Sequence, residues 1–177
     1  MVIIDNKVYF DTDCLSGFLI EKEMGSLFML FKNNIVIPDA VYRELVNYPP
    51  FKAEIEQYVQ NKAITVVDIE FGSEESKIYF QIIKEPHIKK FGDGEAEVIS
   101  FAICNSKKMA SNNLSDVASY VEHYNLINYT ISDIIDMLVK NGIKTQDEAD
   151  QLYVSMKKNG RLLPFNTYTE YLESKAS

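Results

Sequence analysis

Short apolar runs alternate along this chain with longer segments of helical spacing, and this alternation restricts the fold more than any other feature. The runs that we expect to be strands cover residues 7–10, 35–37, 64–69, 108–111 and 126–130. Parallel strands need helical crossovers between them, because the chain must return to the same end of the sheet. The pattern therefore predicts an α/β fold, with a central parallel sheet of about four or five strands flanked by helices.

The segments between these runs carry apolar residues at helical spacing. Helices are expected over 15–31, 39–48, 51–61, 73–84, the stretch after Asp93, and 115–124. Asp39 and Asp93 stand where N-caps belong, and residues 86–94 are expected to form a loop.

No repeat, low-complexity tract or linker divides the 177 residues, and one hydrophobic core usually serves about 100 to 200 residues. We expect a single domain over 1–177, with a core at 8–130 and a helical C-terminal extension at 131–177. The extension begins with a helical pair, 132–140 and 145–158, whose second member opens with a capping box. Its apolar residues exceed the needs of one packing face, so part of it should cover the core or contact a second copy.

Composition favours a globular cytoplasmic protein. Apolar residues make up 46% of the chain and charged residues 25%, which is not the balance of a disordered chain. No apolar run approaches the roughly 20 residues that span a bilayer, and Met1 to Asp5 is too short for the apolar part of a secretory signal. We therefore expect no membrane association, and we expect Cys14 and Cys104 to be reduced thiols of the core.

The charge balance argues against a surface coated in basic residues. The net charge is −8, from 26 acidic and 18 basic residues, and the only arginines are Arg43 and Arg161. Such a chain is poorly suited to holding nucleic acid through its phosphates alone. An acidic metal site could account for part of the negative charge, so a nucleic-acid enzyme is not excluded.

Acidic residues follow four of the expected strands or open the helices beyond them. Asp11, with Asp13 close by, follows the first strand, Glu44 follows the second, and Glu95 and Asp116 begin later helices. Ligands of open parallel sheets bind beyond the carboxyl ends of the strands. We therefore expect Asp11, Glu44, Glu95 and Asp116 to converge on one cleft.

Helical spacing distinguishes Glu95 from its neighbour Glu97. Glu95, Ile99 and Ala102 fall at i, i+4 and i+7, which turns Glu95 toward the buried stripe, whereas Glu97 should point to solvent. Several carboxylates in one cleft repel each other unless cations lie between them. Oxygen ligands suit Mg²⁺ or Mn²⁺, which can lower the pKa of a water and stabilise the charge of a phosphodiester under attack.

Four segments that carry these acids resemble the PIN-domain nucleases, in the order in which that family has them. The segments are Val8-Tyr9-Phe10-Asp11-Thr12-Asp13-Cys14-Leu15, Ile35-Val36-Ile37-Pro38-Asp39-Ala40-Val41-Tyr42-Arg43-Glu44-Leu45, Gly94-Glu95-Ala96-Glu97-Val98-Ile99-Ser100-Phe101-Ala102 and Asn113-Leu114-Ser115-Asp116-Val117. The resemblance spans residues 8 to 130.

The resemblance implies a magnesium- or manganese-dependent ribonuclease that leaves a 5′-phosphate. It also implies that the chain could be the toxin of a toxin-antitoxin pair, with an antitoxin partner, and a homodimer. The fourth segment departs from the pattern, because many relatives carry an aspartate where this chain has Asn112 or Asn113. A degenerate PIN-like domain that binds RNA or protein without catalysis is therefore the main alternative.

Further residues are candidates for the surroundings of the site, and each has a structural alternative. Thr12 and Ser16 could hold a phosphate or a water, or could cap a helix, and Asp13 is expected beside the metal ligands rather than among them. The pairs Lys89–Lys90 and Lys107–Lys108 could steer a phosphate backbone or could be ordinary solvated lysines. His87 and His123 are expected to be structural or surface residues.

A phosphatase is a remote alternative. Asp11 and Asp13 match the aspartate-x-aspartate start of haloacid-dehalogenase-like phosphatases, and Gly92-Asp93 could imitate their late acidic motif. The middle of that pattern, an apolar strand ending in Ser or Thr and a well-placed lysine, is missing.

Overall fold

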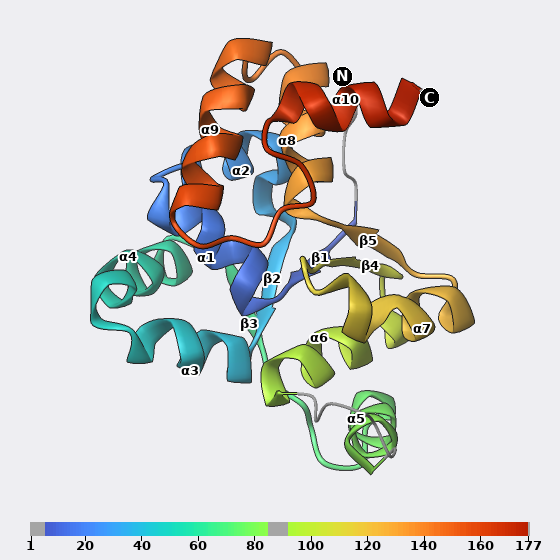
Figure 1. Ribbon diagram of the computed structural model, residues 1–177. Coiled ribbons are helices and arrows are strands. Elements are labelled where there is room, and N and C mark those ends of the chain that lie inside the picture. The colour runs from blue at the N-terminus through green and yellow to red at the C-terminus, as the bar shows by residue number, and fades with distance from the viewer. Residues whose placement is uncertain (1–5, 85–91, 177) are drawn as a thin grey trace.

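The computed structural model describes residues 6–84 and 92–176, and its strands form one parallel sheet (Figure 1). The strand order is β3-β2-β1-β4-β5, with every neighbouring pair parallel. The expected parallel α/β fold is thus confirmed. The strands are β1 (Val8–Phe10), β2 (Ile35–Pro38), β3 (Thr65–Val67), β4 (Lys108–Ala110) and β5 (Ile127–Tyr129).

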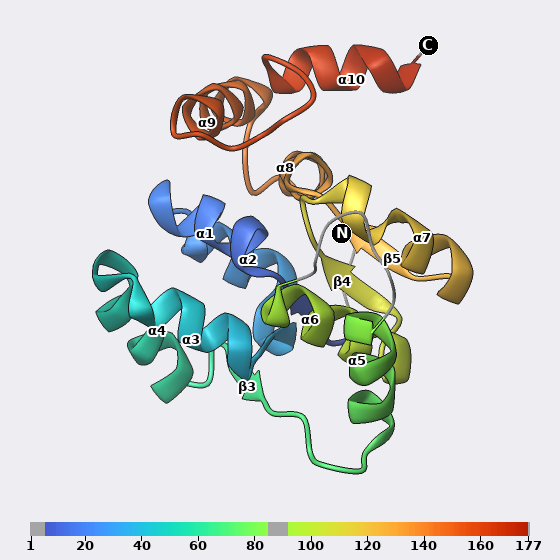
Figure 2. The same cartoon turned by 60° about the horizontal axis from the view of Figure 1, so that its bottom comes forward.

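Helices cover both faces of this sheet, as buried parallel strands require. Helix α6 packs against β1, β2 and β4 on one face, and the C-terminal helices lie together at one end of the molecule (Figures 1 and 2). The helices are α1 (Thr12–Ile20), α2 (Met24–Phe31), α3 (Asp39–Asn47), α4 (Pro49–Gln60), α5 (Glu74–Lys84), α6 (Asp93–Cys104), α7 (Leu114–Tyr124), α8 (Ile131–Lys140), α9 (Gln146–Lys158) and α10 (Tyr168–Ala176), with a 3₁₀ turn at Lys32–Asn34.

The single helix expected over 15–31 is wrong, because two helices occupy that stretch. Lys22 adopts a left-handed conformation, with φ at 61°. The N–H of Lys22 donates to Leu19 O at 3.1 Å and the N–H of Glu23 donates to Phe18 O at 2.8 Å, which closes α1 by a Schellman motif. The apolar spacing continues across this break, so the pattern gave no sign of it.

The N-caps of two helices also differ from the expectations. The residue at the N-cap of α3 is Pro38 and that of α6 is Gly92, so neither Asp39 nor Asp93 is a cap. Asp39 instead accepts a hydrogen bond from Arg43 at 2.7 Å, and Asp93 accepts one from the hydroxyl of Tyr79 at 3.1 Å. Both acids lie in the first turn, where the helix dipole still favours a negative charge.

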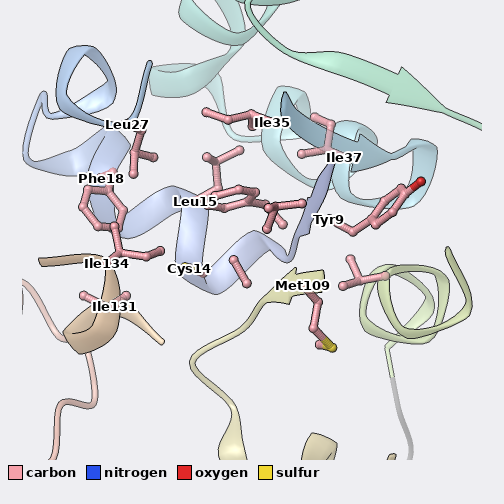
Figure 3. Close-up of a cluster of buried hydrophobic side chains, with 14 of the residues drawn as sticks. Tyr9, Cys14, Leu15, Phe18, Leu27, Ile35, Ile37, Met109, Ile131 and Ile134 are labelled. Atoms are coloured by element: carbon pink, nitrogen blue, oxygen red, sulfur yellow. The ribbon is translucent and has the colours of Figure 1, made fainter. Parts of the chain in front are cut away.

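The C-terminal extension shares the hydrophobic core of the sheet. Figure 3 shows Ile131 and Ile134 of α8 beside Phe18 of α1, and all three side chains have no exposed surface. The two expected helices of the extension are present as α8 and α9, and α9 opens with the expected capping box. A third helix, α10, was not expected from the sequence.

Cys14 is buried, Cys104 is half-buried, and both are free thiols. Among residues 6–84 and 92–176, no helix has the length and apolar character needed to cross a bilayer.

Candidate active site

A small cavity of about 180 Å³ opens at the carboxyl end of β1, where α1, α3 and α6 begin. We call it the acidic cavity. In Figure 2 the starts of these three helices lie side by side, which agrees with the contacts of α3 with both α1 and α6. The residues that line the cavity are Asp11, Thr12, Asp13, Glu44, Gly92, Glu95 and Asn113.

Asp11 is the first residue after β1 and is nearly buried, with 6% of its surface exposed. Its N–H donates to Ala110 O at 3.0 Å, and its Oδ1 accepts the N–H of Cys14 at 2.7 Å, which caps α1. Burial raises the pKa of Asp11 to about 6, against hydrogen bonds from Ser111 and Cys14 that lower it. The folded protein thus disfavours the ionised form of this carboxyl group.

Glu44 reaches the acidic cavity from the second turn of α3. Its Oε2 accepts a short hydrogen bond from the hydroxyl of Thr12. A Cβ atom added to Gly94 would lie 3.1 Å from Oε1 of Glu44. The carboxylate therefore lies against the first turn of α6, where the orphan N–H groups and the helix dipole favour a negative charge.

Asn113 joins the two remaining acids. Its Nδ2 amide donates to Glu95 Oε1 at 3.0 Å and to Asp116 Oδ2 at 2.6 Å. The N–H of Asn113 donates in turn to the hydroxyl of Ser111 at 3.2 Å, which fixes the residue just beyond β4. Asp116 does not line the acidic cavity, but it is linked to Glu95 through this amide.

The remaining candidates are distributed around this centre. Asp13 lines the cavity and forms an ion pair with Arg161, which also donates to Ser16 at 3.2 Å. Asn112 does not face the cavity and donates to Leu162 O at 2.8 Å. His123 is exposed on the last turn of α7. The expectations for His87, Lys89 and Lys90 concern positions outside the described residues.

Of the two alternatives for Lys107 and Lys108, steering a phosphate backbone at the cleft has no support, because neither lysine lines the acidic cavity. Lys108 begins β4, whereas the acidic cavity lies beyond the carboxyl ends of β1 and β4. Because the two strands are parallel, these lysines stand at the opposite edge of the sheet.

The expected solvent position of Glu97 is also wrong. Glu97 has 8% of its surface exposed, and its Oε2 accepts the N–H of Ala40 at 3.1 Å. That N–H belongs to the first turn of α3, where a helix has no internal acceptor for it. Burial raises the pKa of Glu97, and Ala40 and Arg43 act in the opposite direction. Both faces of the first turns of α6 are in contact with protein, which a single amphipathic stripe does not predict.

Sequence reasoning missed Arg161 as a neighbour of the site. It lies 148 residues from Asp13 in sequence, and no local motif connects the two. Gly160, with φ at 88°, ends α9, and the N–H of Arg161 donates to Met156 O at 2.9 Å. This Schellman closure directs Arg161 back toward α1.

The donor set fits a hard divalent cation in its chemistry. Carboxylates, an amide oxygen and a hydroxyl are the oxygen ligands that Mg²⁺ and Mn²⁺ prefer, and Asp11, Glu44, Glu95, Asn113 and Thr12 provide them around one cavity. Within the described part of the chain, no three His, Cys, Asp or Glu side chains are gathered tightly enough to form a metal cluster. Hydrogen bonds from Thr12 and Asn113 occupy oxygens of Glu44, Glu95 and Asp116 instead.

A family model described as a PIN domain matches residues 7–176. The chain belongs to the PIN-domain family. PIN domains are generally nucleases and typically use divalent metals, so the acidic cavity lies in a nuclease-type fold with donors of the right chemistry. The match includes the C-terminal extension as well as the sheet. Searches of curated proteins and of solved structures gave no match.

Proposed function

We propose that this PIN domain is a magnesium- or manganese-dependent endoribonuclease that hydrolyses phosphodiester bonds of single-stranded RNA. The observation that carries the proposal is the convergence of Asp11, Glu44 and Glu95, from three separate helices, on one cavity. Like charges placed together raise the free energy of the fold, and nothing in the packing of the sheet requires them there. A cation between them removes that cost.

The burial of Asp11 supports the same conclusion. Asp11 caps α1, but capping does not require acidic neighbours. Here the charges of Asp13 and Glu44 add to burial in raising the pKa of Asp11. Strongly perturbed carboxyl groups in a cavity are common at functional sites.

In the proposed reaction Asp11, Glu44 and Glu95 would hold the cation, which would supply a water of lowered pKa and neutralise charge on the phosphate. Thr12 orients Glu44 through its hydroxyl, and Asn113 orients Glu95 through its amide. Asp116 acts as a further ligand or as a water-positioning acid, and it shares the Asn113 amide with Glu95.

The decisive experiment is incubation of the purified protein with mixed single-stranded RNA in magnesium, manganese or EDTA. We expect cleavage with either metal, none in EDTA, and none by Asp11→Asn. Asp147→Asn is the matched control, because Asp147 is an exposed acid of the first turn of α9. Cleavage that survives both EDTA and the Asp11 substitution would reject this mechanism.

A toxin with an antitoxin partner is the cytoplasmic role that we propose for this activity, because the family resemblance implies it. Expression of the parent chain in a bacterial host should arrest growth, whereas Asp11→Asn should not. Growth that is unaffected by an active parent enzyme would contradict the toxin role without affecting the reaction.

We also propose a homodimer, supported by exposed apolar residues around a cavity of about 970 Å³ between α7, β5 and the segment before α10. Leu114, Ile127 and Leu162 line it with 54%, 48% and 88% of their surfaces exposed. Exposed apolar surface of this kind marks protein contacts. Light scattering should show a dimer in the parent chain and a monomer for Leu162→Glu.

A non-catalytic RNA- or protein-binding module is the second candidate, and Asn113 is the observation that favours it. Its amide occupies oxygens of both Glu95 and Asp116, which a metal would otherwise use. Binding of RNA without cleavage in any metal would support this module. The phosphatase alternative has no structural support, since Asp93 is not among the residues lining the acidic cavity.

A further inference from the structure

A second cavity of about 280 Å³ adjoins the acidic cavity and shares Thr12 and Glu44 with it. We call it the side cavity. Its volume is close to the lower limit of about 300 Å³ for small-molecule sites. Two hydroxyl groups, one carboxylate, apolar side chains, aromatic rings and one arginine line it. The residues are Thr12, Ser16, Ile20, Glu44, Leu45, Tyr48, Phe51 and Arg161.

Tyr48 provides an exposed aromatic face in this cavity. It stands between α3 and α4 as the C-cap of the first helix and the N-cap of the second. Its ring packs edge-on against Phe51, with centroids 4.7 Å apart and planes at 66°, and Phe51 is 8% exposed. Tyr48 itself keeps 53% of its surface exposed, so a large ring is held in place and left accessible.

Arg161 provides the positive charge. It is the one basic residue among the described residues that line either cavity. Its side chain lies over Gly17, because a Cβ atom added there would lie 3.6 Å from Cδ of Arg161, at ordinary van der Waals distance. The arginine is thus seated on α1 at the border of the site.

The guanidinium of Arg161 is only partly satisfied by the protein. Within the described residues its hydrogen bonds all use Nη1, which donates to Asp13 and to Ser16. Nε is buried without a hydrogen-bond partner among those residues. Nη2 makes no hydrogen bond within the described residues, and the side chain keeps 18% of its surface exposed, so the guanidinium can still bind an anionic ligand.

We propose that the side cavity binds one nucleotide of the RNA next to the phosphodiester in the acidic cavity, with its base stacked on Tyr48 and its phosphate on Arg161. Aromatic rings stack on any unpaired base, and arginine matches the planar geometry of a phosphate. Only a single-stranded nucleotide can enter, because a paired base is covered by its neighbours. That the adjoining phosphodiester is cleaved rests on the proposed function; the nucleotide site does not.

Binding can be measured without cleavage in the Asp11→Asn background, by fluorescence anisotropy with a labelled single-stranded hexaribonucleotide. Tyr48→Ala should weaken binding about 5- to 150-fold, the range of base stacking on one aromatic ring. Tyr48→Phe keeps the ring and should bind within about twofold of the background protein. Phe71→Ala is the matched control, since Phe71 is 98% exposed and lines neither cavity.

The role of Arg161 is tested through salt dependence. Removing one phosphate contact should reduce the slope of log K against log salt by about 0.7 for a single strand. Arg161→Gln should show this smaller slope, and Arg161→Lys should restore it. Asp13→Asn, which breaks the same ion pair but keeps the arginine, should leave the slope no smaller than that of the background protein.

The two proposals fail in different ways. If the parent protein binds RNA but never cleaves it, the ribonuclease is refuted. If Tyr48→Ala weakens that binding, the nucleotide site still stands. Equal affinity of the Tyr48→Ala and Phe71→Ala proteins would overturn the nucleotide site, and so would the absence of any RNA binding at high micromolar protein.

Discussion

Gly94 faces the carboxylate of Glu44 so closely that a Cβ atom on Gly94 would lie 3.1 Å from Oε1 and 3.4 Å from Oε2. The same Cβ atom would come within 3.0 Å of Cγ2 of Val41. The absent side chain therefore lets α3 and α6 approach each other where Glu44 meets the first turn of α6. Glycine at this position is part of the geometry of the acidic cavity.

Gly94→Ala should displace Glu44 and separate the two helices. Overpacking of a tight contact typically costs about 1 to 3 kcal/mol, so we expect urea unfolding to show a loss of this size together with a weaker response to manganese. Gly25→Ala is the matched control. Gly25 lies in α2 with no atom within 4 Å of an added Cβ, so that substitution should be neutral or mildly stabilising.

The sheet and the places of the acids could be predicted because both depend on local pattern. A strand that is apolar on both faces, followed by a polar residue, identifies the carboxyl edge of a parallel sheet, and Asp11 follows β1 in this way. Family order then placed Glu44, Glu95 and Asp116 in one region. The hydrogen bonds from Thr12 to Glu44 and from Asn113 to Glu95 join segments that are distant in sequence. Periodicity describes local structure only and does not predict them.

Glu97 shows where periodicity fails. An amphipathic helix has one buried stripe, but α6 lies between the sheet, α3 and α5, so its opposite face is buried as well. The partner of Glu97 is a backbone N–H at the start of α3, 57 residues earlier in the chain. Such a contact exists only after the two helices have packed.

Glu97→Gln should leave the protein as stable as the parent, or more stable, at about pH 8. Glutamine keeps an oxygen that accepts the N–H of Ala40, and it removes a carboxyl group whose pKa is raised by burial. Glu97→Ala should cost about 1 to 3 kcal/mol, because the N–H of Ala40 loses its acceptor. Chemical denaturation of the three proteins checks the order. Equal losses for glutamine and alanine would show that the charge, and not the acceptor, is what the site needs.

Asn113→Asp should destabilise the metal-free protein and increase its stabilisation by metal. The substitution removes the amide that donates to Glu95 and Asp116 and places a third carboxylate between them. We expect a lower melting temperature in EDTA and a larger rise with manganese than in the parent. Asn112→Asp is the control, because Asn112 donates to Leu162 O and faces away from the acids. A variant whose manganese response matches that of the parent would remove position 113 from the metal site.

Asp11→Asn tests the buried carboxylate directly through the pH dependence of stability. The pKa of Asp11 rises in the folded protein from its ordinary value of 3.8 to about 6, with burial as the main cause. A raised pKa means that the folded state favours the protonated acid, so its contribution to stability is full below about pH 4 and is lost as the pH rises through about 6. At about 1.4 kcal/mol for each factor of ten in proton affinity, the loss is about 3 kcal/mol.

Asparagine removes this penalty and can still cap α1, so in EDTA at about pH 8 the variant should exceed the parent in stability by up to about 3 kcal/mol, and the gain should vanish near pH 4. Manganese at a hundredfold excess over its Kd should stabilise the parent by about 2.7 kcal/mol, or about 5 to 11 °C in melting temperature, and the variant by much less. Thermal unfolding of both proteins with EDTA and with manganese, at each pH, measures all of these differences. Two results together would show that Asp11 is only the cap of α1: a lower metal-free melting temperature of the variant at about pH 8, and no response of the parent to manganese. In that case the buried charge would not destabilise the folded protein, and no cation would be needed to offset it.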